Sequence, residues 1–233
     1  TTGFQGDYST LDVAAASPQA GLTPIIQEAI NLAAVGGTIN IQAGTYTGNV
    51  DASAKAVTLA PGGAGVAALV NITGNLALGR LDTLAMDING PTPGTEYDQI
   101  STTGTVNLNS DSGSGAALQM MRAPAYVPTE PAAFTIISNG SGNPVAPAAP
   151  TPKFQGLAEG GRIFLSGNLL TVSYVGGDGN DVTLSVVTPT TPILALDFST
   201  INYATTFQPG GVFVENTSGV GIADANTINM ANI

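Results

Sequence analysis

The 233-residue sequence contains no cysteine, no histidine and no tryptophan. Without cysteine the chain forms no disulfide framework. The absence of histidine as well excludes most zinc sites, together with histidine-based catalytic triads and general bases. We therefore predict that the protein is not an enzyme, that it needs no cofactor and that it holds no metal tightly.

Positive charge is also scarce. Five Lys and Arg residues stand against sixteen Asp and Glu residues, which gives a net charge of −11. The basic residues do not cluster, so the chain would be repelled by a nucleic-acid backbone and by an anionic membrane surface. No stretch approaches the roughly 18 consecutive apolar residues that a membrane-spanning helix needs. We expect neither a nucleic-acid partner nor a membrane span.

Glycine, with 30 residues, and proline, with 15, are plentiful instead, and Thr and Val are frequent. This composition favours turns and strands. One helix is predicted over 23–35, with Thr23 as its N-cap, Pro24 at the first helical position and Gly36 and Gly37 at its end. Short apolar runs bounded by turns follow, at a spacing typical of the coils of a β-solenoid. They lie at 38–50, 56–60, 68–73, 82–88, 98–101 and 105–109.

The stretch "TPIIQEAINLAAVGGTINIQAGTYTGNV", residues 23–50, resembles the opening of right-handed parallel β-helix proteins of the pectate-lyase-like superfamily. In that superfamily an amphipathic helix covers the open end and the first coil follows at once. A cap of this kind covers a bare core cross-section and unpaired strand edges. The resemblance therefore implies a capped β-helix.

A second resemblance covers "LDTLAMDINGPTPGTEYDQISTTGTVNL" (81–108), "AFTIISNGSG" (133–142) and "FQGLAEGGRIFLSGNLLTVSYVGGDGNDVTLSV" (154–186). These segments look like the β-helical passenger-type units of large exported bacterial surface proteins, including autotransporter-like adhesins. The resemblance implies an extracellular or cell-surface location. The Pro- and Ala-rich stretch 143–152 interrupts it, and we expect an exposed loop there because proline cannot serve a central ladder.

Within this region "YVGGDGNDVTL" (174–184) nearly spells the calcium-binding nonapeptide of parallel β-rolls. However, Thr183 stands where that nonapeptide has a large apolar residue, and only one copy is present. Apolar residues alternate before and after the "GGDGND" turn, which favours two half-buried strands joined as a hairpin. We predict the hairpin, with Asp178 and Asp181 as calcium ligands in the alternative reading.

Polysaccharide-cleaving enzymes of β-helical fold use carboxylates, and glycoside hydrolysis needs a pair of them flanking the bond. Two candidate pairs are Asp82 with Asp87 and Glu96 with Asp98. We interpret all four as solvated carboxylates near turns. A carbohydrate-binding or polysaccharide-cleaving β-helix remains the alternative function, although the lack of tryptophan argues against a rich sugar platform.

After the Pro- and Thr-rich linker 188–192, the stretch 193–233 resembles the beginning of the cadherin-like or immunoglobulin-like modules of bacterial surface proteins. Asn226 stands where that family often has an acidic residue, which weakens Asp224 as a calcium candidate. Strands are expected at 193–198, 211–215 and 227–233. Their apolar side chains are the predicted interaction residues: Ile193, Leu194, Leu196, Phe198, Val212, Phe213, Val214, Ile228, Met230 and Ile233.

Three such strands cannot close a sandwich, so something must cover them. Either the rest of the module lies outside this chain, or the segment pairs with an exposed edge of a neighbouring subunit. We favour pairing between copies, which would build a head-to-tail filament.

The sequence thus predicts an all-β protein. A capped right-handed parallel β-helix occupies 1–187, a linker follows at 188–192, and a partial sandwich-like segment occupies 193–233. We expect an extracellular structural protein that forms a rod or filament with copies of itself, with cell-surface glycans as a further partner class.

Overall fold

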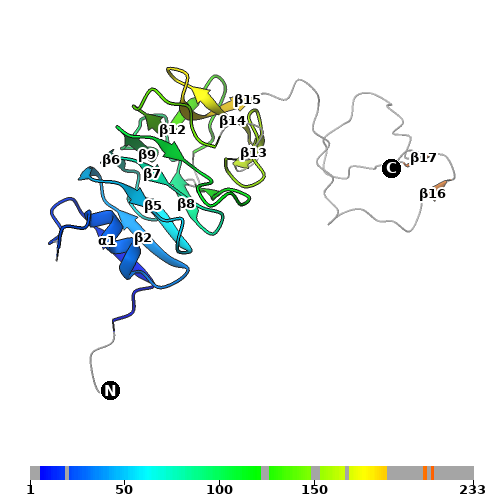
Figure 1. Ribbon diagram of the computed structural model, residues 1–233. Helices are drawn as coiled ribbons and strands as arrows, with labels where there is room; N and C mark the ends of the chain where they lie inside the picture. Colours follow the sequence, from blue (N-terminus) through cyan, green and yellow to red (C-terminus); the bar gives the residue numbers. More distant parts are fainter. Residues whose placement is uncertain are drawn as a thin grey trace. The chain divides into compact units, whose positions relative to one another are not determined.

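The structure of the protein is a computed structural model that describes residues 6–18, 21–121, 126–147, 153–165 and 168–187, together with the backbone of four residues near the C-terminus. Strands dominate and a single short helix is present among the described residues, so the chain is all-β as predicted (Figure 1). The chain divides into two compact units, Thr1–Thr188 and Pro189–Ile233.

In the second unit the described backbone forms strands β16 (Phe207–Gln208) and β17 (Gly211–Val212), which pair antiparallel. The other predicted interaction residues of 193–233 lie outside the described residues, as does Asp224.

Three sheets make up the first unit, and the first of them is entirely parallel. Its strand order is β1-β2-β5-β8-β11. Side chains alternate between the two faces of each strand, which buries Ile39, Ile41, Leu59, Leu84 and Met86. The bounds are β1 Thr10–Val13, β2 Gly37–Ile41, β5 Val57–Pro61, β8 Thr83–Asp87 and β11 Ala117–Met121.

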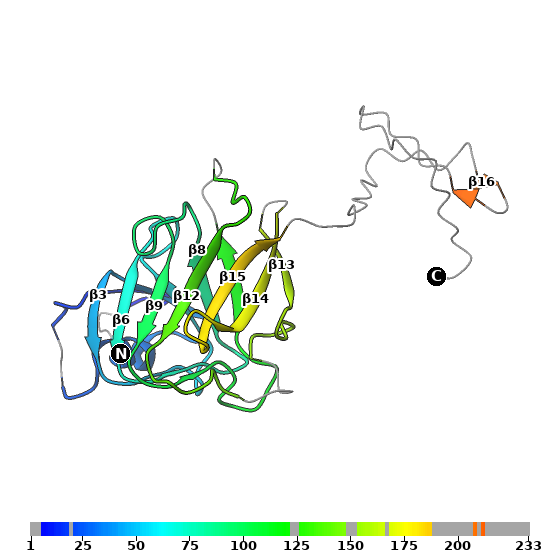
Figure 2. The same cartoon turned by 90° about the horizontal axis from the view of Figure 1, so that it is seen from above.

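The second sheet is narrow and also parallel, in the order β10-β7-β4. It comprises β4 (Val50–Asp51), β7 (Leu76–Ala77) and β10 (Val106–Asn107). The third sheet has the order β13-β14-β15-β12-β9-β6-β3, and Figure 2 shows its strands side by side. Its bounds are β3 Gly44–Thr47, β6 Leu69–Thr73, β9 Gln99–Thr102, β12 Ala133–Asn139, β13 Arg162–Leu165, β14 Asn168–Gly176 and β15 Asp181–Val187.

The chain visits the three sheets in a fixed order. Strands β2, β3 and β4 enter the first, third and second sheet in turn, and β5, β6, β7 and then β8, β9, β10 repeat that sequence. Each pass places apolar side chains in the space between the sheets. In the narrow sheet these are Val50, Leu76 and Val106, all of them buried.

A glycine corner marks each passage from the third sheet to the second. The sequence reads T-G-N-V at 47–50, T-G-N-L at 73–76 and T-G-T-V at 103–106. A Cβ atom on Gly74 would collide with the Gly48 carbonyl, and one on Gly104 would collide with the backbone of Gly74. Only glycine lets successive corners approach this closely, which explains why the residue recurs at this place.

Helix α1 (Ile25–Leu32) lies over the N-terminal end of the sheets and packs against β1, β2, β3 and β4 (Figure 1). Its buried side chains include Ile26 and Ile30, as the predicted helical face requires. The helix is shorter than predicted, and Pro24 rather than Thr23 stands at the N-cap. It ends before the glycines because Ala34 already donates a backbone hydrogen bond to Tyr8, ahead of β1.

Two expectations about the later part of the unit are wrong. The parallel arrangement does not extend to 187, because β15 pairs antiparallel with β12, β14 with β15, and β13 with β14. A hairpin connection can only join antiparallel neighbours, so the tight 176–181 turn enforces this change.

The stretch 143–152 is not simply an exposed loop. Val145 is buried, and Ala146 forms a parallel bridge with Asn107 that continues the narrow sheet. The Ala146 N–H donates to the Val106 carbonyl at 2.8 Å, and Leu108 donates to the Ala146 carbonyl at 3.0 Å. The segment can form these backbone hydrogen bonds because the paired residue is Ala146, which has the N–H group that the flanking prolines lack. Residues 148–152 lie outside the described residues.

Candidate functional site

Asp98 is one of three fully enclosed candidate carboxylates. Its side chain is 1% exposed, and it lies just before β9. One carboxylate oxygen accepts a hydrogen bond from the Ala68 N–H and the other accepts one from the Asp87 N–H, both at 2.7 Å. Burial raises the pKa of Asp98 to about 7, and the nearby Asp87 carboxylate acts in the same direction, whereas the two N–H donors oppose the shift.

Asp87 lies at the end of β8 and is equally buried. Its carboxylate accepts a hydrogen bond from the Gly65 N–H at 2.7 Å, in the loop between β5 and β6. Burial raises the pKa of Asp87 above its ordinary value. Asp87 and Asp98 therefore form a pair of linked acidic groups, each holding a backbone segment of the preceding pass through the sheets.

Asp82 has the same role one corner away. Its carboxylate accepts hydrogen bonds from Gly79 N–H at 2.7 Å and from Val57 N–H at 3.3 Å, and the latter belongs to the preceding strand of the first sheet. Burial raises the pKa of Asp82 to about 6, and the carboxylates of Asp111 and Asp51 add to the shift. We call Asp82, Asp87 and Asp98 the buried carboxylates.

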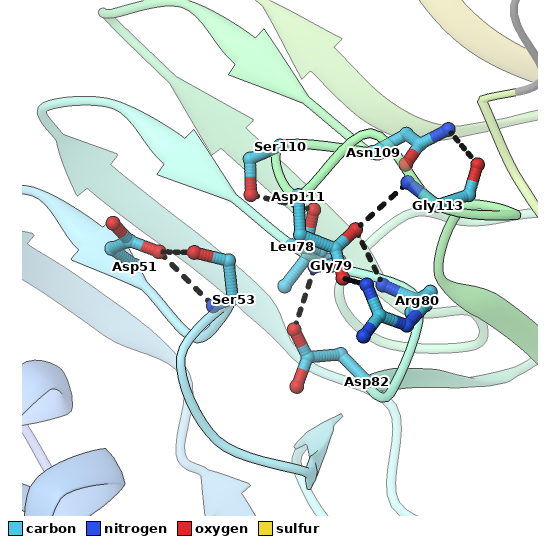
Figure 3. A network of polar contacts seen from close by, with 10 residues as sticks. All are labelled: Asp51, Ser53, Leu78, Gly79, Arg80, Asp82, Asn109, Ser110, Asp111 and Gly113. Atoms are coloured by element: carbon cyan, nitrogen blue, oxygen red, sulfur yellow. Dashed lines mark hydrogen bonds and ion pairs between the residues drawn. The ribbon is translucent and has the colours of Figure 1, made fainter.

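Figure 3 shows the surroundings of Asp82, where three corners of the chain lie next to one another. Arg80 forms an ion pair with Asp111 at 2.9 Å, and Asp111 also accepts the Arg80 N–H. Asp51 accepts the N–H and the hydroxyl of Ser53. The acidic groups at this corner are thus engaged with backbone, hydroxyl or guanidinium donors.

In each predicted carboxylate pair the two members hold different groups, and Asp82 binds the N–H groups of Gly79 and Val57 whereas Asp87 binds that of Gly65. Glu96 lies in a turn and accepts the Thr92 N–H at 2.9 Å, while Asp98 points into the interior. The pair that does come together is Asp87 with Asp98, which are eleven residues apart. The interpretation of Asp82, Asp87 and Asp98 as solvated is wrong, because their burial depends on backbone donors from distant parts of the chain that local sequence does not reveal.

The predicted hairpin is present. Strands β14 and β15 pair antiparallel around a turn in which Gly177 and Gly179 have φ values of +57° and +113°. Asp178 is exposed at this turn. Asp181 is buried, and its carboxylate accepts the Asn139 N–H at 2.8 Å, which fastens the hairpin to the end of β12. Asp181 therefore serves a contact across 42 residues.

A second set of side chains, unnoticed in the sequence, lines the corner beside the narrow sheet. Asn75 N–H donates to the Asn49 side-chain oxygen at 2.9 Å, and the Asn75 side-chain oxygen accepts the Thr105 N–H at 2.8 Å. These three residues occupy the third place of the T-G-[NT]-[VL] corners. The recurrence of that motif at 47, 73 and 103 is the signal that would have found them.

Among the described residues no three or more histidine, cysteine, aspartate or glutamate side chains gather as metal ligands would. In the same part of the chain, no helix has the length and apolar character to cross a membrane. No protein-family model, no curated protein and no solved structure matches the chain.

Proposed function

We propose that the first unit is a short right-handed parallel β-helix that serves as a rigid structural module of an extracellular or cell-surface protein. The observation that carries the proposal is the threefold recurrence of one pattern. Each pass contributes a strand to each sheet in the same order, and each turns at an equivalent glycine corner. A recurring unit that contacts only its neighbours is the defining property of a solenoid.

The polar contacts support a mechanical rather than a catalytic role. The buried carboxylates accept hydrogen bonds from backbone N–H groups of the preceding pass. At another corner the side-chain oxygens of Asn49 and Asn75 accept the backbone N–H groups of Asn75 and Thr105 in the following pass. Charge-assisted hydrogen bonds to backbone donors are among the stronger ones in proteins. Neighbouring passes are thus tied by side chains as well as by ladders, which suits a module that must stay rigid without disulfides.

The same contacts weigh against the alternative of polysaccharide cleavage. A catalytic carboxylate must reach the bond that it hydrolyses. Asp82, Asp87 and Asp98 are each 1% exposed and already hold backbone donors. Their raised pKa values follow from burial beneath the protein surface, so these shifts do not by themselves mark an acid–base centre.

The assembly part of the proposal is a filament, in which residues 193–233 of one copy supply a strand to the next copy. What supports it is the apolar, strand-like pattern of that segment in the sequence. Such donation would join copies head to tail and leave the ends open for growth.

Negative-stain images of the full chain, together with a deletion of residues 193–233, test this function. The structural proposal predicts fibres from the full chain and a folded, non-polymerising β unit from the deletion. Equal assembly by the truncated chain would contradict strand donation. Release of reducing or unsaturated sugar ends from pectin-like polymers would contradict the structural role itself.

A further inference from the structure

Strand β13 is the last strand of the seven-stranded sheet. It pairs with β14 along one edge, with Ile163 opposite Leu170, and among the described residues no strand or hydrogen-bonding group occupies its other edge. The side chains alternate: Ile163 packs against the core, whereas Arg162 is exposed and the Phe164 side chain is 63% exposed. An exposed aromatic side chain thus lies on an open sheet edge.

The backbone groups on this edge can be identified from the ladder. The Gly161 carbonyl accepts the Val172 N–H at 2.8 Å. In an antiparallel pair every second residue bonds to the partner strand, so Gly161, Ile163 and Leu165 face β14. The N–H and C=O groups of Arg162 and Phe164 therefore face away from it and are available to another strand.

At the opposite end of the unit, the β4 edge is covered. Strand β4 ends the narrow sheet, and the Gln27 side chain of α1 covers it with two hydrogen bonds. The Gln27 amide donates to the Asp51 carbonyl at 2.9 Å and accepts the Asp51 N–H at 2.7 Å. The contact blocks strand addition at β4, whereas no described residue blocks it at β13.

We propose that the partner at this edge is a second copy of the same chain, with the two β13 strands antiparallel about a two-fold axis at Ile163. In this register Ile163 faces its own counterpart, and Arg162 of each copy lies opposite Phe164 of the other. The outward backbone groups of Arg162 and Phe164 then exchange hydrogen bonds between the copies. The Arg162 guanidinium of each copy also contacts the Phe164 ring of the other.

Self-complementarity is the reason to prefer a second copy over an unrelated strand. The register centred on Ile163 joins the outward backbone groups, keeps core-facing side chains on one face, and places each of the exposed cations against a ring. A two-fold contact uses the same patch on both partners and closes on itself. Four residues per copy cover much less than the roughly 800 Å² per partner of a standard interface, so we expect weak association.

Sedimentation velocity of the chain lacking residues 193–233, which cannot donate a strand to a filament and keeps the compact unit Thr1–Thr188, measures this association over a concentration series. A monomer–dimer equilibrium that stops at two copies is expected, which distinguishes this contact from an open-ended filament built by residues 193–233. Phe164→Pro should abolish the dimer, because proline removes an outward N–H that β14 does not use. Phe164→Thr keeps the backbone donor and should weaken the dimer without abolishing it.

A cysteine cross-link tests the register, and it is clean because the chain has no native cysteine. In the proposed register the two Ile163 Cα atoms form a non-hydrogen-bonded pair about 4.5 Å apart, within the range that a disulfide spans. Ile163→Cys should therefore give a covalent dimer on mild oxidation. Val175→Cys, at an exposed position on β14 away from the axis, is the matched control.

Thermal melts verify that each variant is folded. A chain lacking residues 193–233 that stays monomeric at the highest soluble concentration would overturn the proposal. So would an Ile163→Cys protein that cross-links no faster than the Val175→Cys control. If Phe164→Pro fails to fold, the cross-linking comparison decides alone.

Discussion

A helix covers the N-terminal end of the β unit, whereas the antiparallel strands β13, β14 and β15 form the other end of the large sheet. At the first end α1 buries Ile26 and Ile30 over the core, Gln27 occupies the β4 edge, and Lys55 donates to the last helical carbonyls. At the second end the Glu159 carboxylate accepts the Tyr174 N–H at 2.7 Å, but β13 remains open along one edge.

The two ends differ because a helix and a hairpin cover different parts of a sheet end. A helix covers core cross-section and strand edge together, because it satisfies its own backbone and can use side chains on the neighbouring ladder. A hairpin adds strands and so moves the open edge outward without removing it. Breaking the first closure should therefore cost stability, whereas changing the last strand should affect association more than folding.

The largest effect is expected from the core-facing side of the helix. Ile26→Ala removes a fully buried side chain over the end of the sheets, and truncations of this kind cost about 2–5 kcal/mol. Leu32→Ala on the same helix is the matched control, since Leu32 is exposed and should change stability by no more than about 0.5 kcal/mol. Chemical denaturation measures both. Equal losses would mean that α1 does not close the core.

A smaller loss is expected from the buried carboxylates, and it should depend on pH. Asp98→Asn replaces one acceptor oxygen by an NH2 group that faces a backbone N–H donor. Leaving a buried donor unsatisfied costs about 1–3 kcal/mol. Asp178→Asn, at the exposed turn, is the matched control and should be neutral. Urea denaturation at pH 7 compares the two variants.

The wild-type protein should be more stable in mild acid than above neutrality. The folded-state pKa values of Asp82 and Asp98, about 6 and about 7, lie above their ordinary value of 3.8. The folded state therefore binds protons more tightly than the unfolded state. The tighter proton binding adds to the free energy of unfolding. This contribution is fully present below about pH 4 and is lost as the pH rises through 6–7. Asp98→Asn should make the stability less dependent on pH. A wild-type melting temperature that rises from pH 5 to pH 8 would contradict the prediction.

The two hydrogen bonds between the Gln27 side chain and Asp51 of β4 should contribute about 1 kcal/mol or slightly more to the free energy of unfolding, because both are partly exposed. Gln27→Glu keeps the acceptor for Asp51 N–H but places a carboxylate against the Asp51 carbonyl, so stability should fall by roughly that amount. Glu28→Gln, its neighbour on the helix, changes charge equally in the opposite sense and controls for net charge. Similar melting temperatures for both variants would exclude the edge contact as a stabilising one.

The smallest effect is expected at the hairpin turn. Because Asp181 holds the Asn139 N–H and Asp178 is exposed, added calcium should leave the melting temperature unchanged in the wild type and in the Asp178→Asn, Asp181→Asn double variant. A large calcium-dependent rise that the double variant lacks would show that the turn is a calcium site.

Local chemistry explains which features the sequence predicted. The hairpin follows from glycines at the turn and from alternation at Leu170, Val172 and Tyr174, all of which are buried. The helix follows from its apolar spacing. These patterns need no knowledge of distant residues, although the shorter extent of α1 reflects its contact with Tyr8.

The buried carboxylates could not be recognised in the same way. In "TEYDQI" Asp98 looks like a turn residue, and its burial depends on Ala68, thirty residues earlier. Ala146 was missed because neighbouring prolines argue against a ladder, although the alanine itself supplies the hydrogen bonds. The corner residues Asn49 and Asn75 could have been found in the sequence, because each follows a T-G pair. The recurrence of this motif predicts that the corners lie next to one another.

Amide hydrogen exchange on the full chain tests most directly whether the parallel strands and the hairpin form one cooperative unit. The amides of β2, β5 and β8 and those of β14 and β15 should be the slowest to exchange, with similar free energies of opening. Clearly separate opening energies for 37–102 and 168–187 would contradict the account, because the hairpin would then be an appendage rather than the closing element of the fold.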